Sequence, residues 1–150
     1  MKKYFIVFIA VFLVAGLWYA FTVRSVDAPI ESQVSEVPTY VNASADDIVV
    51  TTPTPGSDTQ VPIMIKGQAR GMWYFEASFP IRILDSNGLV IGQGIATAEG
   101  DWMTESFVPF TASIALTSAY TGIATLVLDK DNPSGDAIRD ASVSLPININ

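Results

Sequence analysis

The chain has 150 residues, a formal net charge of -7, and neither cysteine nor histidine. The lack of cysteine excludes disulfides and thiolate metal sites, and the lack of histidine excludes Ser-His and Cys-His nucleophile systems and imidazole metal ligands. Because the chain is acidic and has no basic cluster, we expect no nucleic-acid partner.

The first element is an apolar segment over residues 4–23, YFIVFIAVFLVAGLWYAFTV, which carries no charge. A helix of this length spans roughly 30 Å, which is the thickness of a bilayer core. Lys2 and Lys3 precede it, so the positive-inside rule places the N-terminus in the cytoplasm and the rest of the chain outside. We therefore predict a short cytoplasmic tip and a single-pass anchor within residues 1–23. A cleaved signal peptide, which would leave a secreted domain, is the alternative.

The next segment, residues 24–46, holds Pro, Ser, Glu and Asp without sustained periodicity, which is typical of a flexible, solvated tether. From residue 47 to residue 150, short β-rich runs are separated by turn-forming residues. The expected strands are residues 47–52, 61–69, 72–79, 108–117, 122–129 and 141–149, together with a hairpin over residues 80–98. About seven or eight strands with regular turn signals predict one antiparallel β-sandwich domain over residues 47–150.

The aromatic run at residues 72–79, MWYFEASF, raises the question of a carboxylate set among aromatic rings. Alternation with period two divides the run between two faces of a strand. The expected core face is Trp73, Phe75, Ala77 and Phe79, and the half-polar face is Met72, Tyr74, Glu76 and Ser78. We interpret Glu76 as an ordinary strand residue, with a ligand-binding role as the alternative.

The hairpin over residues 80–98 has its turn at residues 85–88 (DSNG), where Asn-Gly supplies the positive φ angles of a tight turn. Gly92 and Gly94 are expected to make room for a bulky neighbour such as Trp73 or Trp102, or to mark a bulge. The expected core residues of this hairpin are Ile81, Ile83, Leu89, Ile91 and Ile95.

The clearest core faces come later in the chain. The run at residues 122–129 is apolar on both sides and suits a central strand. In the flanking runs the expected core residues are Val108, Phe110, Ala112, Ile114 and Leu116, and then Val143, Leu145, Ile147 and Ile149.

Two loops carry acidic residues. Residues 129–136, DKDNPSGD, contain oxygen ligands but have Ser134 where a calcium-binding EF-hand loop needs glycine, so we expect a polar turn, with weak calcium binding as the alternative. Paired carboxylates near a tryptophan are typical of glycosidases. Glu99, Asp101 and Glu105 flank Trp102, but in so small a domain we interpret them as solvated loop residues.

Several motifs then occur in a defined order. They are Gly67 to Ala69 as a turn after a proline-led strand, Phe75-Glu76, the turn at residues 85–88, Trp102-Met103, Val108-Pro109-Phe110, and the NPSG of residues 132–135. Residues 47–149, which carry them, resemble the immunoglobulin-like domain of bacterial spore germination, a domain often found beside GerMN domains. The resemblance implies an extracytoplasmic immunoglobulin-like fold with an interaction role and without established catalytic residues.

These observations predict a membrane-anchored, extracytoplasmic immunoglobulin-like β-sandwich in the bacterial cell envelope. We expect a non-enzymatic module for protein–protein interaction or scaffolding that binds another envelope protein, with strand addition at an exposed sheet edge as one route. We assign no catalytic, cofactor-binding or metal-binding residues. The alternative is a cell-wall or glycan-binding module that uses exposed aromatic side chains such as Trp102 or Tyr120.

Overall fold

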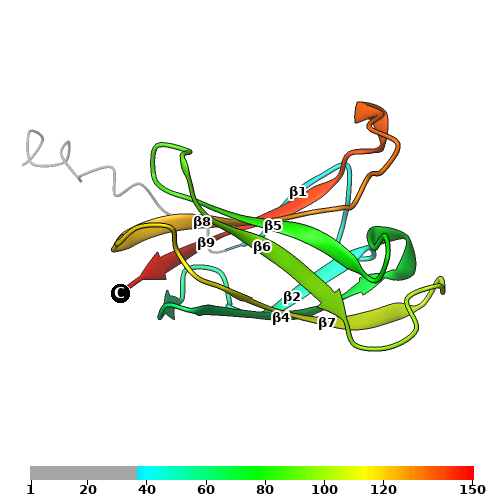
Figure 1. Ribbon diagram of the computed structural model, residues 1–150, viewed down its shortest axis with the longest axis horizontal. Coiled ribbons are helices and arrows are strands. Elements are labelled where there is room, and N and C mark those ends of the chain that lie inside the picture. Colours follow the sequence, from blue (N-terminus) through cyan, green and yellow to red (C-terminus); the bar gives the residue numbers. More distant parts are fainter. Residues whose placement is uncertain (1–36) are drawn as a thin grey trace, which may run out of the picture. The chain divides into compact units, whose positions relative to one another are not determined.

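The computed structural model describes residues 37–150 (Figure 1). The predicted anchor at residues 4–23 and the larger part of the predicted tether lie outside the described residues. Within residues 37–150, no helix is long and apolar enough to cross a membrane.

The described part of the chain is built from strands and two short 3-10 helices. Their bounds are β1 (Thr39–Val41), β2 (Ile48–Thr52), β3 (Asp58–Thr59), β4 (Ile63–Arg70), η2 (Gly71–Trp73), β5 (Ser78–Leu84), β6 (Val90–Ala98), β7 (Phe107–Ile114), β8 (Gly122–Asp129), η3 (Ala137–Arg139) and β9 (Ser142–Ile149). The strands pair in the order β1-β9-β8-β5-β6-β7-β4-β2, and β3 lies beside β9. Every pair is antiparallel except β3 with β9. The predicted all-β antiparallel fold is therefore confirmed.

The sheet folds over into two facing layers. Figure 1 shows β5, β8 and β9 in one layer and β2, β4 and β7 in the other. β6 pairs with β5 along its length and reaches β7 through Thr97 and Ala98 near its end, so this strand links the two layers.

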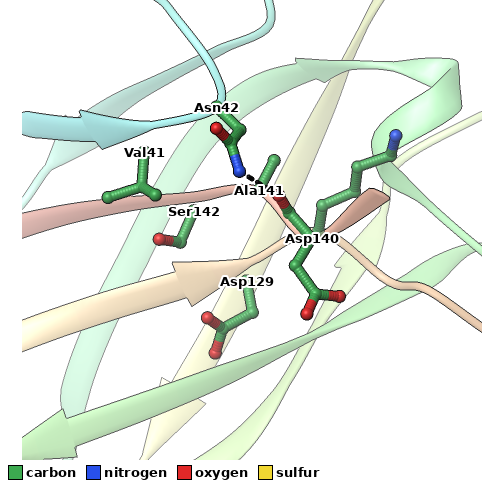
Figure 2. A pocket seen from close by; sticks show the side chains of 7 residues that line it. Val41, Asn42, Asp129, Asp140, Ala141 and Ser142 are labelled. Atoms are coloured by element: carbon green, nitrogen blue, oxygen red, sulfur yellow. Dashed lines mark hydrogen bonds between the residues drawn. The ribbon is translucent and has the colours of Figure 1, made fainter. Parts of the chain in front are cut away.

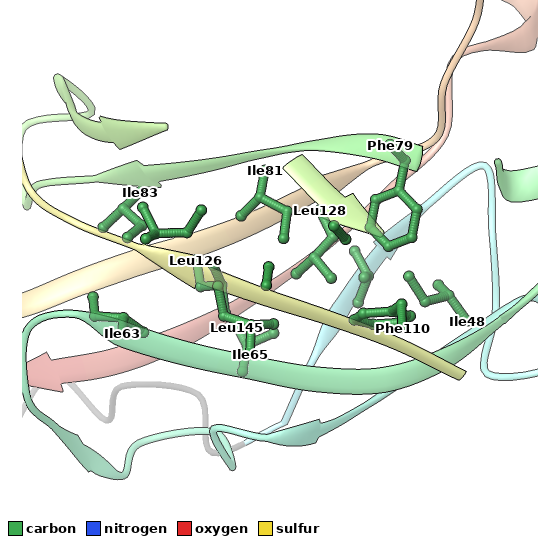
Figure 3. Close-up of a cluster of buried hydrophobic side chains, with 14 of the residues drawn as sticks. Ile48, Ile63, Ile65, Phe79, Ile81, Ile83, Phe110, Leu126, Leu128 and Leu145 are labelled. Carbon is green, nitrogen blue, oxygen red and sulfur yellow. The ribbon is translucent and has the colours of Figure 1, made fainter. Parts of the chain in front are cut away.

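The core fills the space between these layers (Figure 3). The rings of Phe79 from β5 and Phe110 from β7 meet edge to face with centroids 5.0 Å apart, an arrangement that aromatic pairs favour. The faces predicted for β7 and β9 are buried as expected: Val108, Phe110, Ala112, Ile114, Val143, Leu145, Ile147 and Ile149. β8 lies between β5 and β9, which confirms it as a central strand.

Two short strands were not predicted, so the described residues contain nine strands rather than seven or eight. β3 is two residues long, and β1 lies inside the segment predicted to be a tether. β1 pairs with the first residues of β9, which lie about one hundred positions later in the chain. The folded domain therefore begins before residue 47.

The hairpin is confirmed, with a correction in its second strand. The pairing shifts register between Ile83 and Leu84, where β6 places Ile91 as an extra residue. A bulge of this kind reverses which residues face inward beyond it. Ile95 is consequently exposed, and Gly94 faces the core instead, where an added Cβ would collide with Ile114. Both predicted roles of the glycines occur here, but the bulky neighbour is Ile114 rather than a tryptophan. Leu89, also predicted as a core residue, is exposed.

The strand predicted over residues 72–79 is wrong. Residues 71–73 form η2, and β5 begins only at Ser78. Between them Glu76 and Ala77 form a tight turn with φ angles of 50° and 62°. Trp73 and Phe79 are buried as predicted, but Tyr74 is buried and Phe75 is exposed, which is the reverse of the predicted faces.

The turn predicted at Gly67 to Ala69 is also absent, because these residues lie within β4. Gly67 has a packing role there. A Cβ at this position would collide with the Val49 carbonyl oxygen and the Phe110 ring, so only glycine lets β2 and the core approach so closely.

Candidate functional site

Four connecting segments meet at one end of the sandwich. They follow β1, β4, β6 and β8, which all end on the same side because their neighbours run antiparallel (right side of Figure 1). We call this surface the loop end and define it as residues 42–47, 71–77, 99–106 and 130–141.

Hydrogen bonds between distant residues hold the loop end together. Asn42 Nδ2 donates to the Asp140 carbonyl at 2.9 Å and joins the first segment to the last. Arg70 joins the first segment to the third, because its Nε donates to the Asp46 carbonyl at 2.8 Å and its Nη1 to the Glu105 carbonyl at 3.0 Å. The same guanidinium stacks on the Phe107 ring at 4.4 Å from its centroid, a cation–π contact.

The segment 71–77 is fixed at its start by close packing. Gly71 is buried, and a Cβ there would collide with the carbonyl oxygens of Trp102 and Thr104. The Asp131 amide donates to the Trp73 carbonyl at 3.1 Å, which ties this segment to the one after β8. All four segments are therefore linked to one another.

Tyr74 anchors the same segment to β7. Its ring centroid lies 5.3 Å from that of Phe79, and its hydroxyl donates to the Val108 carbonyl at 2.7 Å. Burial of the phenol disfavours its charged form and raises the pKa of Tyr74 to about 12. Tyr74 is therefore held against β7 on the core side, whereas Met72 and Phe75 of the same segment are exposed.

The turn after Phe75 places Glu76 in solvent. The Phe75 and Ser78 amides each donate to the other's carbonyl, at 3.0 and 3.1 Å, and so close the turn around Glu76 and Ala77. Within the described residues the Glu76 carboxylate has no hydrogen bond or ion pair. As predicted, aromatic rings do not enclose this carboxylate, but it lies in a turn and not on the predicted strand.

A pocket of about 300 Å³ opens beside this turn, between the segments 71–77 and 130–141. We call it the aromatic pocket. Its lining residues are Met72, Tyr74, Phe75, Lys130, Asp131, Asn132, Pro133, Ser134 and Arg139. Met72 and Phe75 are 67% and 42% exposed, and Ile138, next to Arg139, is 82% exposed. Neither Lys130 nor Arg139 has a side-chain hydrogen bond or ion pair to another residue in the range 37–150.

A second pocket of about 300 Å³ shares Lys130 with the first (Figure 2). Its carboxylates are those of Asp129 and Asp140. Asp129 already holds Arg82 through two contacts, Nε to Oδ2 at 2.8 Å and Nη2 to Oδ1 at 2.9 Å. Asp140 Oδ1 accepts a hydrogen bond from Asn132 Nδ2 at 2.7 Å. Both side chains therefore serve the fold.

The loop considered for calcium uses its polar atoms internally. Asn132 Nδ2 also donates to the Asp136 carbonyl at 2.8 Å, Ser134 Oγ donates to Asn132 Oδ1 at 2.6 Å, and Asp136 Oδ1 accepts from the Ile138 amide at 3.2 Å, capping η3. Over the described range, no group of three or more acidic side chains is placed to hold a metal ion.

The aromatic residues predicted as a glycan platform do not lie together. Trp102 is in the loop end, whereas Tyr120 lies between β7 and β8 at the opposite end. Both are partly buried against the core. The Tyr120 hydroxyl donates to the Ile123 carbonyl of β8 at 2.6 Å and accepts from the Ser86 amide at 3.4 Å, so it is used within the fold.

The outer edge of β9 is covered along most of its length. β1 pairs with Ser142 to Ser144, and β3 pairs with Asn148 and Ile149. Between them the Gly56 amide donates to the Pro146 carbonyl at 2.8 Å. Strand addition, which needs a row of free backbone groups, is therefore obstructed at this edge. The other edge strand, β2, has five residues and an irregular register.

Comparison with protein families gives one match. A family model described as the immunoglobulin-like domain of bacterial spore germination matches residues 47–137. The matched region runs from the start of β2 into η3 and includes every residue that lines the aromatic pocket except Arg139. No curated protein and no solved structure matches the chain.

Proposed function

The chain belongs to the family of immunoglobulin-like domains of bacterial spore germination, and from this premise we propose that it is a non-enzymatic protein-interaction module of the bacterial cell envelope. In this proposal residues 4–23 anchor the chain in the cytoplasmic membrane and the β-sandwich lies outside. Another envelope protein is the partner.

The observation that supports this function is the loop end. Its four segments are cross-linked by hydrogen bonds, and yet it leaves the apolar side chains of Met72, Phe75 and Ile138 exposed. A surface that is already ordered loses little conformational entropy when a partner binds, so more of the contact energy appears as affinity. Aromatic residues, methionine and arginine are also the types enriched at protein interfaces.

The alternatives have less support. A glycan-binding module would need an aromatic platform, and Trp102 and Tyr120 are partly buried at opposite ends. Strand addition is obstructed at β9. A contact through side chains of the loop end is therefore the form of interaction that we propose.

Site-specific photo-cross-linking in native membranes tests this function. A photoreactive amino acid at Phe75 in the full chain should give a discrete adduct with another protein. The same group at Met64, which is 48% exposed on the outward side of β4, is the matched control and should give none. The absence of a protein adduct from Phe75 and from every other exposed loop-end position would contradict an interaction role.

The location of the domain has a separate test. Because the chain has no cysteine, a single introduced thiol is unique. Ser86→Cys, in the exposed hairpin turn, should react with a membrane-impermeant maleimide in intact cells or spheroplasts. Labelling only after the membrane is broken would place the domain in the cytoplasm and contradict the proposed topology.

A further inference from the structure

We propose that the aromatic pocket binds an acidic segment of the partner protein, one that presents an apolar side chain beside its carboxylates. This inference rests on the proposed interaction function and specifies its site and the chemistry of the partner. Two features of the pocket support it, namely its exposed apolar rim and its unpaired cations.

The apolar part of the site is the group Met72, Tyr74, Phe75 and Pro133. The methionine and phenylalanine are exposed on the rim, whereas Tyr74 is fixed below by its bond to Val108. A pocket of about 300 Å³ is at the small end of the range of ligand sites, which is about 300–1,000 Å³. It therefore suits one or two side chains of a segment better than a whole cofactor.

The charged part of the site consists of Lys and Arg side chains that are not paired elsewhere. Of the eight Lys and Arg residues, three precede residue 37, which leaves five in the described part of the chain. Arg70 donates to the Asp46 and Glu105 carbonyls, and Arg82 is paired with the Asp129 carboxylate. Lys66 is exposed on the outward side of β4.

The remaining two cations, Lys130 and Arg139, both line the aromatic pocket, where Asp131 is the one carboxylate. The lining residues therefore carry two cations and one carboxylate, although the chain as a whole is acidic and Glu76, Asp136 and Asp140 belong to the same two segments. Such a site attracts carboxylates and repels a basic segment, and electrostatic complementarity of this kind sets the choice of partner.

The test measures binding of defined probes to the full chain in detergent by fluorescence anisotropy. The probe is a short labelled peptide of Glu, Phe and Gly. In the two control peptides Glu is replaced by Lys or Phe is replaced by Ser. We expect the acidic, aromatic peptide to bind, and added salt to weaken it. Lys130→Glu and Arg139→Glu should each weaken it roughly tenfold, since each removes a charge-assisted contact.

Matched variants outside the pocket serve as controls. Lys66→Glu makes the same change of charge on β4. Met72→Ser removes an apolar side chain from the pocket and should also weaken binding, and Met64→Ser makes the same substitution on β4 as its control. The controls should bind as the wild type does. Arg139→Gln is a milder second variant, and thermal unfolding shows whether each protein is folded.

Three results would overturn the inference. The first is that the Lys-containing peptide binds as tightly as the Glu-containing one. The second is that Lys66→Glu weakens binding as much as Lys130→Glu or Arg139→Glu does. The third is tighter binding of a peptide with the sequence of residues 24–36, which would assign the pocket to this chain's own acidic segment.

The cross-linking experiment separates failure of the inference from failure of the function. If the Phe75 adduct persists undiminished in Lys130→Glu and Arg139→Glu, the interaction function stands and the pocket inference fails. If no protein adduct forms even with the wild-type pocket, both fail.

Discussion

β5 is entered through the segment 71–77 and left through the turn 85–89, and these two connections are held in different ways. The turn is held mainly by its own residues: Asp85 Oδ1 accepts hydrogen bonds from the Asn87 and Leu89 amides, both at 2.8 Å, and Gly88 supplies a φ of 81°. Its hydrogen bond to a remote residue is the longer one from the Ser86 amide to the Tyr120 hydroxyl, at 3.4 Å. The entering segment is held by residues far away in sequence, at Trp102, Val108 and Asp131. A turn held by local hydrogen bonds depends little on the rest of the domain, whereas the entering segment keeps its conformation only when the domain is folded.

The difference bears on function as well as on stability. The exposed apolar side chains of Met72 and Phe75 are positioned by the folded domain, because their neighbours are fixed in the core and in β7. A change that loosens the long-range contacts should therefore disturb the loop end first, and a change in the turn should leave it unaffected.

The largest expected effect is that of Gly71→Ala. The added methyl group would collide with two backbone carbonyls, which cannot move as the end of a flexible side chain can. We expect a loss of about 3 kcal/mol in the free energy of unfolding, measured with urea. Gly88→Ala meets open space and should cost about 1–2 kcal/mol, from its positive φ alone. If Gly88→Ala costs as much as Gly71→Ala, the contrast between the two connections is wrong.

A smaller effect is expected for Tyr74→Phe, which leaves the buried Val108 carbonyl without its donor. The loss should be about 1–2 kcal/mol. In the folded wild type the pKa of Tyr74 is raised from 10.0 to about 12. The stability that the protonated phenol contributes is therefore fully present below pH 10 and is lost as the pH rises from 10 to 12. Urea unfolding over this range should show a steeper loss in the wild type than in Tyr74→Phe. Parallel curves would indicate that the phenol is not buried in solution.

The smallest effect is expected for Asp85→Asn, since the amide keeps one acceptor oxygen for the turn. Hydrogen bonds from the Leu89 and Asn87 amides hold the pKa of Asp85 below its usual value of 3.8. The stability that the charged carboxylate adds is therefore present at neutral pH and is lost as the pH falls below that value. Thermal midpoints of variant and wild type should differ slightly at pH 7 and converge in acid. If Asp85→Asn also abolished the photo-cross-linked adduct at Phe75, the turn and the loop end would be coupled.

The sequence predicts well those parts of the fold that depend on local pattern. The alternation in β7 and β9 identifies their buried faces because both strands are regular, and Asn87-Gly88 identifies the hairpin turn. The entering segment was missed because Glu76 and Ala77 both adopt positive φ, although neither residue type is typical of such a turn. Ile95 was misplaced because one extra residue at Ile91 reverses the faces, and alternation alone does not reveal a bulge.

The candidate site was largely missed for a related reason. The sequence favours Trp102 and Tyr120 as binding residues because they are aromatic, whereas Lys130 and Arg139 become candidates only through the pocket that they share with Phe75. A signal was nevertheless present. Phe75-Glu76 and residues 132–135 both belong to the motifs that carry the family resemblance, and in the folded domain both adjoin or line one pocket.

The pairing of β1 with β9 also orders events in time. β1 is among the first residues of the domain to be synthesised and β9 the last, so the sheet cannot close until about residue 149 has left the ribosome. Until then the outer edge of β8, which β9 covers, stays open along eight residue positions. Such contacts between remote parts of a chain form slowly. A chain that lacks residues 142–149 would therefore keep most of its core sequence but leave the edge of β8 unpaired, and would be an easy substrate for proteases.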